Sequence, residues 1–182
     1  MENRKNITIL NQYLSGKVSN LGLYLLGIIL LSVSSKISIP FYPVPMTLQT
    51  FVVYFIAASM GMVGFYSTIS YVALGLMGLP IFAAGGGMGY VISPTFGFLE
   101  GMIWASFVIA YISNNLFNKN IFQLIFAILI GAFIIFFCGI IHLTGYIGLE
   151  KALAAGLYPF IYSEFLKIAL AISISYLLIK KN

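Results

Sequence analysis

The segment LYPFIYSEFLK, residues Leu157–Lys167, decides the fold that we expect for this chain. It opens the last long apolar segment, which continues to Ile179, and it places Glu164 and Lys167 inside that segment. A helix rises about 1.5 Å per residue, so a helix that begins near Tyr158 carries Glu164 about 9 Å and Lys167 about 14 Å into a hydrocarbon core roughly 30 Å thick. Each such charge costs about 2.5–3.5 kcal/mol at the centre of a membrane. Their position therefore indicates a function.

Glu164 and Lys167 are three residues apart, so on a helix they share one face and can pair with each other. Two interpretations of the pair stay open. The pair can lock two helices together, or it can face a cavity that receives a polar ligand.

The composition predicts a membrane protein. Of the 182 residues, 61% are hydrophobic and only 7% are charged, and the mean hydropathy is +1.05. Soluble domains are about one quarter charged. No charged residue lies between Lys36 and Glu100, an interval from which no soluble surface could be built. The net charge of +5 is scattered at segment ends and forms no basic stripe with interleaved aromatic residues, so we expect a lipid bilayer as the partner and no nucleic acid.

Six segments are long and apolar enough to span a membrane, and we expect one all-α domain, residues 1–182, with six transmembrane helices. The approximate segments are 18–33, 47–62, 63–79, 95–113, 121–143 and 157–179. Helices satisfy their backbone hydrogen bonds inside lipid, and no segment alternates with the period of two that a membrane barrel would show. Only residues 61–64 separate the second and third segments, and we favour two helices with a tight turn over one bent helix.

The basic residues predict the orientation. With six spans both termini lie on one side, and that side is predicted to be cytoplasmic because it holds six Lys and Arg residues against two on the other. The six are Arg4, Lys5, Lys17, Lys119, Lys180 and Lys181, and the two are Lys36 and Lys151. We therefore expect a multi-pass protein of the cell membrane whose segment 1–17 is cytoplasmic. The apolar run after residue 20 is too long for a signal-peptide core, so we expect no processing.

The outward connections differ from the inward ones in composition. All six prolines fall in the outward connections: Pro40, Pro43, Pro45, Pro80, Pro94 and Pro159. The longest outward loop also holds a glycine cluster, residues 85–89, where backbone can approach a ligand closely. Irregular backbone at membrane depth is tolerated where it lines a cavity. Because Glu164 and Lys167 enter the membrane from the same side, we expect a binding cavity in the outer half, beneath these loops.

The first outward loop reads IPFYPVPMTLQT, residues Ile39–Thr50, and it carries two polar side chains at the start of the second helix. Thr47 can cap that helix. Gln49 is uncharged and offers two donors and an acceptor, so it can bind a neutral polar ligand or brace a neighbouring loop.

Several kinds of site are absent from the sequence. The glycines of the third loop, residues 74–101, do not form GxGxxG, and no GxxxxGK[ST] occurs, so neither a dinucleotide site nor ATP hydrolysis by a P-loop is expected. Cys138 is the only cysteine, which excludes an internal disulfide and a cysteine-based metal cluster. We expect Cys138 to pack in the bundle, and we expect no catalytic residue, metal or cofactor.

Four motifs in order, IPFYPVPMTLQT, GLPIFAAGGGMG, SPTFGF and LYPFIYSEFLK, resemble the BioY family, the biotin-capturing S components of energy-coupling factor importers. The resemblance covers residues 37–182. It implies a six-helix S-component fold, a biotin site at the outer side, and an acid and a Lys of the last helix that reach the ligand, at Glu164 and Lys167. The family more usually has Asp at the first of these positions. The implied partners are a transmembrane coupling subunit and two ATPase subunits.

The candidate site fits the chemistry of biotin, which joins a ureido ring and a carboxylate through apolar groups. Glu164 can accept from the ureido N–H groups, and Lys167 can donate to the ureido carbonyl or pair with the acid. Which end of biotin meets Lys167 stays open. The apolar walls and loop backbone complete the candidate ligand-binding residues, which are Glu164, Lys167, Phe41, Val44, Gln49, Ala84, Gly85, Phe98 and Phe160.

Two alternatives in function remain open. One is an S component for a different vitamin. The other is an intramembrane enzyme that uses His142 and Glu100, although His142 can also be structural, and Glu100 can line the cavity or pair with Lys167. S components typically dock through a small-xxx-small pattern on the first helix. Here Gly27 and the serines at 32, 34 and 35 never fall four residues apart, so we do not expect docking through such a pattern there.

Overall fold

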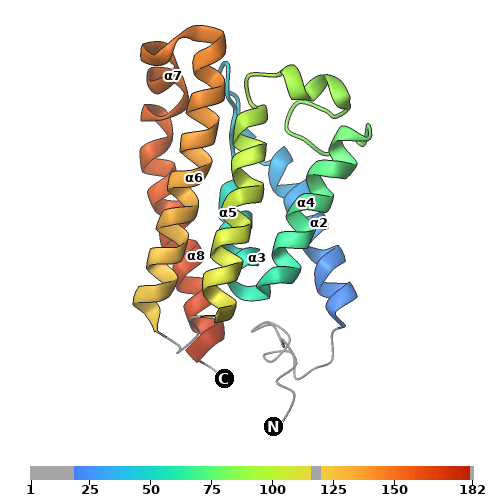
Figure 1. Ribbon diagram of the computed structural model, residues 1–182, viewed down its shortest axis with the longest axis vertical. Helices are drawn as coiled ribbons and strands as arrows, with labels where there is room; N and C mark the ends of the chain where they lie inside the picture. The colour runs from blue at the N-terminus through green and yellow to red at the C-terminus, as the bar shows by residue number, and fades with distance from the viewer. Residues whose placement is uncertain (1–18, 116–119, 181–182) are drawn as a thin grey trace.

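The computed structural model describes residues 19–115 and 120–180, which form a helical bundle (Figure 1). The predicted N-terminal segment 1–17 and the basic residues Arg4, Lys5, Lys17, Lys119 and Lys181 lie outside the described residues. Each of the six predicted segments contains a helix: α2 (Asn20–Lys36), α3 (Gln49–Met60), α4 (Met62–Leu76), α5 (Phe96–Asn115), α6 (Ile121–Ile147) and α8 (Ile161–Lys180).

Within residues 19–115 and 120–180, three stretches are long and apolar enough to cross a membrane by length and composition. They are Phe96–Ser113 in α5, Ile121–Ile147, which is α6, and Leu149–Leu178, with mean hydropathies of 1.5, 3.1 and 1.5. The helices α2, α3 and α4 are apolar but shorter, at 17, 12 and 15 residues.

The outward connections contain short elements that the sequence did not predict. A hairpin of β1 (Ser38–Ile39) and β2 (Met46–Thr47) pairs Ser38 with Thr47 and Ile39 with Met46. The prediction of a mostly helical bundle stands, and this connection adds a hairpin that was not predicted, because strands of two residues are too short to show alternation. Helix α7 (Leu149–Gly156) and the 3₁₀ turns η1 (Met88–Ile92) and η2 (Tyr158–Phe160) were also missed.

The last helix begins later than predicted. Pro159 lies in the 3₁₀ turn η2, and the α-helix starts only at Ile161. Glu164 therefore lies in the first turn of α8, near the positive end of the helix dipole.

The predicted tight turn between the second and third segments is confirmed, but it is a single residue. Gly61, with φ +57°, separates α3 from α4, and Gly64 then lets the two helices touch. A Cβ atom at Gly64 would lie 2.3 Å from the carbonyl oxygen of Ile56. The backbones of α3 and α4 approach each other so closely that only glycine fits there.

Helix α3 occupies the centre of the bundle. All of its residues are buried except Phe51 and Phe55, and it packs against α4, α5 and α8. Helices α5 and α6 form the most extensive helix pair, with glycines on both helices at the contact. Cys138 is half-buried on α6 and lies against Gly101 of α5, as expected for a packing residue.

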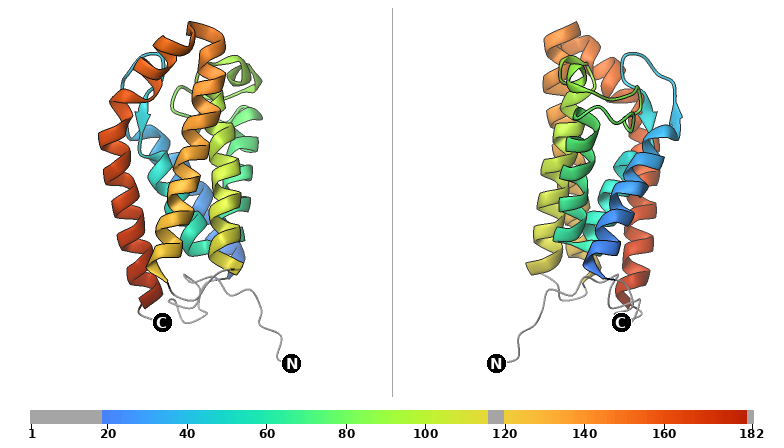
Figure 2. Two further views of the ribbon diagram at one scale, coloured as in Figure 1. Left: turned by 60° about the vertical axis from the view of Figure 1, so that its left-hand side comes forward. Right: turned by 90° about the vertical axis from the view of Figure 1, so that its right-hand side faces the viewer.

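The outward connections gather at one end of the bundle. The β1–β2 hairpin, the loop from Met77 to Thr95 and α7 lie at the end opposite to the start of α2 and the end of α8 (Figures 1 and 2). This arrangement puts the Pro-rich connections together over the open end of the helices, where the sequence predicted a cavity.

Candidate functional site

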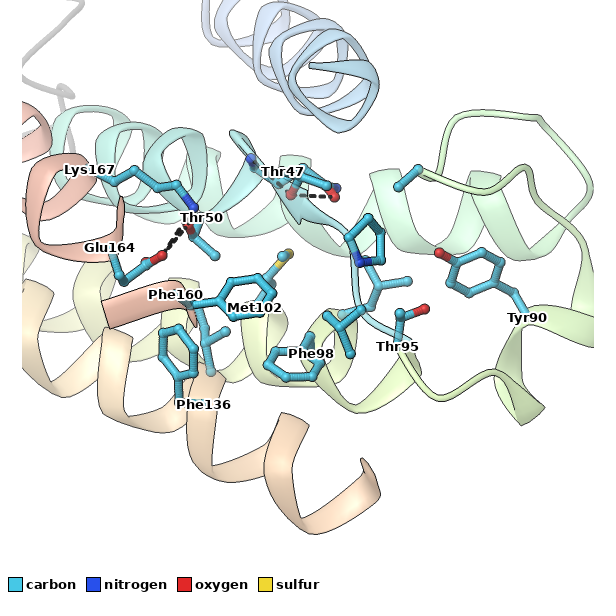
Figure 3. Close-up of a pocket in the computed structure, with 16 residues that line it drawn as sticks. Thr47, Thr50, Tyr90, Thr95, Phe98, Met102, Phe136, Phe160, Glu164 and Lys167 are labelled. Carbon is cyan, nitrogen blue, oxygen red and sulfur yellow. Dashed lines mark hydrogen bonds and ion pairs between the residues drawn. The ribbon is translucent and has the colours of Figure 1, made fainter. Parts of the chain in front are cut away.

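A pocket of about 510 Å³, including the solvent-filled space at its mouth, lies beneath the outward connections (Figure 3). The first and third outward loops, the helices α3, α5, α6 and α8 and the turn η2 all contribute to it. The lining residues are Val44, Pro45, Thr47, Gln49, Thr50, Ala83, Tyr90, Thr95, Phe98, Leu99, Met102, Ile135, Phe136, Phe160, Glu164 and Lys167.

The charged pair lies at one end of this pocket. Lys167 Nζ is 3.1 Å from Glu164 Oε2, and the two residues are only 7% and 5% exposed. The pairing that their three-residue spacing predicts is confirmed. Both side chains also line the pocket, so the pair does more than join two helices. Figure 3 shows them at the end of the pocket away from Tyr90 and Thr95.

Two side chains of α3 hold the carboxylate of Glu164. Tyr54 OH donates to Oε1 at 2.6 Å, and Thr50 Oγ1 donates to Oε2 at 3.0 Å. With the bond from Lys167, the carboxylate accepts three hydrogen bonds within the protein. This role of Thr50 and Tyr54 was not predicted from the sequence, although their four-residue spacing places them on one face of a helix.

Lys167 keeps one donor for a ligand. Its ammonium group donates to Thr50 Oγ1 at 3.2 Å and to Glu164 Oε2 at 3.1 Å. An ammonium group has three N–H donors. At this end of the pocket Lys167 therefore has one N–H group left for a ligand, and its positive charge is balanced by the negative charge of Glu164.

Replacing Tyr54 with phenylalanine should weaken ligand binding at the pair. Tyr54 is fully buried, and it contacts Glu164 without lining the pocket. The variant removes one of the three hydrogen bonds that position the Glu164 carboxylate, and a hydrogen bond to a charged group contributes about 1.5–3 kcal/mol. With the carboxylate less well positioned, we expect the affinity for biotin, the ligand of the family that the motifs resemble, to fall about tenfold or more in calorimetric titration. Tyr24→Phe is the matched control, because Tyr24 OH donates to Ser70 away from the pocket. Equal losses in both variants would contradict the role of Tyr54.

Gln49 is positioned for both of the roles that the sequence left open. Its side chain lines the pocket, and its Nε2 atom donates to Tyr71 OH at 2.7 Å. Tyr71 OH in turn lies 3.0 Å from the carbonyl oxygen of Ile81 in the third loop. The predicted cap at Thr47 is shifted by one residue: Leu48 occupies the N-cap position, while Thr47 Oγ1 accepts from the backbone N–H of Gln49 at 3.3 Å.

Three of the four residues predicted as apolar walls lie at the pocket. Val44, Phe98 and Phe160 line the pocket, but Phe41 does not. Phe41 is 44% exposed, and its ring packs on the ring of Phe160, with 6.4 Å between the centroids. Phe136 is a wall residue that the sequence analysis missed, because nothing in an apolar helix marks which face meets a cavity.

The third loop contributes Ala83 in place of the predicted Ala84 and Gly85. Phe82 anchors this loop: it is fully buried, and it bonds with Gly85 through both backbone groups. The short turn that results presents Ala83 to the pocket and leaves Ala84 and Gly85 outside its lining. Tyr90 and Thr95, further along the loop, also line the pocket and were missed.

His142 and Glu100 lie outside the pocket lining. His142 Nε2 is 3.1 Å from the carbonyl oxygen of Ser93, and the ring packs on Phe96, as expected for a structural histidine. Glu100 is exposed on α5. Both expectations for Glu100 are wrong: it does not line the cavity, and the carboxylate that pairs with Lys167 belongs to Glu164.

Comparisons with known proteins agree with the motifs. The chain matches the model of the BioY family over residues 4–181. It is 37% identical over 145 residues to the biotin transporter BioY of Thermotoga maritima, which covers 78% of this chain and 85% of that protein. It is 33% identical over 168 residues to the probable biotin transporter BioY of Pyrococcus horikoshii, covering 87% of this chain and 95% of that protein.

A solved structure has the same fold. The crystal structure of the S-component for biotin from an ECF-type ABC transporter matches with a TM-score of 0.81 and 26% sequence identity, covering 92% of this chain and 94% of that one. The S-component fold that the resemblance implied is confirmed. Since a family model matches almost the whole length and relatives align over most of theirs, this membrane protein belongs to the BioY family.

Proposed function

We propose that this chain is the biotin-capturing subunit of a vitamin importer and that it binds biotin in the pocket beneath the outward loops. One observation carries the proposal: a buried, electrically neutral Glu164–Lys167 pair with one unused N–H donor lies at one end of an otherwise largely apolar pocket. Biotin has a neutral ureido group at one end and an apolar body, so its chemistry matches this arrangement. The relatives named above as biotin transporters support the same ligand.

The charges favour one orientation of the ligand. If the carboxylate of biotin met Lys167, two carboxylates would share one buried ammonium group, and the site would carry a net negative charge at a large desolvation cost. The ureido carbonyl is neutral and can accept the remaining N–H of Lys167 without that cost. We therefore place the ureido ring at the Glu164–Lys167 pair.

The apolar middle of biotin then faces the walls of the pocket, and its carboxylate reaches the other end. Phe98, Met102 and Phe136 lie between the two ends (Figure 3). The hydroxyl groups of Tyr90 and Thr95 lie at the far end, where they can donate to a carboxylate that keeps part of its hydration.

The membrane arrangement belongs to the same proposal. The six helices α2, α3, α4, α5, α6 and α8 cross the cell membrane, with the pocket outward and both termini cytoplasmic. The distribution of Lys and Arg supports this orientation. Because the sequence has no P-loop, a transmembrane coupling subunit and two ATPase subunits would supply the energy, and this subunit would perform no catalysis of its own.

Isothermal titration of the detergent-purified protein tests the ligand directly. We expect saturable, one-to-one binding of biotin and no heat from riboflavin or thiamine under the same conditions. Thiamine is a cation without a urea, and the ring system of riboflavin is a wide planar tricycle with a single imide N–H in place of the two ureido N–H groups of biotin. Mass spectrometry of the protein as purified should identify biotin as a co-purified ligand. If the protein gave no binding heat with biotin and bound another vitamin, the chain would be assigned as an S component for that vitamin.

A further inference from the structure

We infer that Tyr71, a residue outside the pocket lining, determines which ligands the pocket accepts by fixing the orientation of the Gln49 amide. The inference rests on the proposed function. Gln49 lines the pocket, and its amide can in principle present either an N–H donor or a carbonyl acceptor to a ligand. The two orientations select opposite ligand chemistry.

The carbonyl group of Ile81 decides the direction of the hydrogen bonds. A backbone carbonyl only accepts, so Tyr71 OH, 3.0 Å from the Ile81 oxygen, must donate its single proton there. The hydroxyl oxygen of Tyr71 is then an acceptor toward Gln49, 2.7 Å away. The group that faces Tyr71 must be the Nε2 amide of Gln49, and the Oε1 atom points the other way.

The Oε1 atom is therefore the part of the Gln49 amide left for a ligand. It accepts from Thr47 Oγ1 at a long 3.3 Å, and a carbonyl oxygen has two lone pairs. Glu164, the other strong acceptor of the pocket, already accepts from Tyr54, Thr50 and Lys167. Gln49 Oε1 is thus the acceptor best able to meet a ureido N–H group of biotin, while Lys167 meets the ureido carbonyl.

Tyr71 is held firmly enough to act in this way. It is fully buried on α4, and its ring meets the ring of Phe82 edge to face, with 5.5 Å between the centroids. A rotated Gln49 amide would place its oxygen against the Tyr71 oxygen, whose proton is already used. Leaving such buried polar groups unpaired disfavours the rotated form roughly tenfold or more.

A ligand series tests the inference. The probes are biotin and the two nearly isosteric cyclic carbamates in which one or the other ureido N–H is replaced by oxygen. In the wild-type protein we expect one carbamate to bind at least about tenfold more weakly than biotin, because its ring oxygen would face Gln49 Oε1. In Tyr71→Phe the Gln49 amide is free to rotate and to donate to the ring oxygen of the carbamate. The ratio of the biotin affinity to the carbamate affinity should therefore fall to about threefold or less.

Lys36→Met is the matched control. Lys36 Nζ also holds the third loop, donating to the Phe82 carbonyl at 2.6 Å, and no bond joins it to Tyr71 or Gln49 in the described structure. This variant should keep the wild-type ratio of biotin to carbamate affinity even if the third loop loosens. Equal collapse of that ratio in Lys36→Met and Tyr71→Phe would assign the effect to the loop and overturn the inference.

Gln49→Leu supplies the second variant, for use also if Tyr71→Phe does not fold. This variant should no longer discriminate between biotin and the carbamate. Adding Tyr71→Phe to Gln49→Leu should not change the ratio of the two affinities further. Retention of the wild-type ratio in Gln49→Leu or in folded Tyr71→Phe overturns the inference, as does a wild-type protein that binds biotin and both carbamates equally. A wild-type protein that does not bind biotin at all instead refutes the proposed function.

Discussion

Lys167→Met should lower the affinity for biotin by at least about 100-fold in calorimetric titration. The variant removes the N–H donor proposed for the ureido carbonyl, and it leaves the carboxylate of Glu164 buried without its cation. Removing one partner of a buried ion pair typically costs about 3–5 kcal/mol, so the thermal midpoint of the protein in detergent should fall as well. The loss of affinity follows from the missing third N–H donor, and the loss of stability follows from the missing 3.1 Å contact with Glu164.

A double variant separates binding from folding. Glu164→Gln/Lys167→Met has no buried charge, so its thermal midpoint should recover most of what Lys167→Met loses, while biotin binding should stay lost. Lys151→Met, at an exposed residue of α7, controls for the loss of a positive charge and should bind as the wild type does. If the double variant bound biotin within tenfold of the wild type, the ammonium group would not be the recognition element.

Gly64→Ala should destabilise the bundle strongly, because it forces two packed helices apart. The new Cβ would lie 2.3 Å from the oxygen and 2.6 Å from the carbon of the Ile56 carbonyl group. Both are backbone atoms of a buried helix and cannot rotate away, so α3 and α4 must separate. Overpacking of this kind costs about 1–3 kcal/mol or more, and it should appear as a lower thermal midpoint together with weaker biotin binding.

Gly145→Ala is the matched control for this prediction. Gly145 also lies within a helix, α6, but a Cβ atom there would meet nothing within 4 Å. Alanine is the better helix former by up to about 1 kcal/mol, so this variant should be as stable as the wild type or slightly more stable. Equal midpoints for the two variants would show that the close approach of α3 and α4 does not require glycine.

The sequence predicted the helices because their signals are local. Long apolar segments, the prolines of the outward connections and the glycine between α3 and α4 can each be recognised without knowing what they contact. The errors arose where a local signal was weak or ambiguous. Pro159 delayed the start of α8 by a turn of 3₁₀ helix, and the paired strands of the first loop were too short to show a pattern.

The candidate site divides in the same way. Glu164 and Lys167 could be found from the sequence because charge within an apolar segment is conspicuous and their spacing alone predicts the pair. The choice of Ala83 over Ala84, and the exclusion of Phe41, depended on how a loop turns around the buried Phe82. The conformation of such a turn depends on the side chains that pack around the loop. No single residue of the loop therefore shows from the sequence which side chain will face the pocket.

By itself the sequence determined a membrane bundle of apolar helices, a cavity beneath the Pro-rich connections, a charged pair and a resemblance to one family. Only the tertiary structure decided how that pair and the Gln49 amide are held. Thr50 and Tyr54 lie 114 and 110 residues from the carboxylate that they bind, and Tyr71 lies 22 residues from Gln49. Hydrogen bonds depend on distance in space, and over such separations the packing of α3 against α4 and α8 sets that distance.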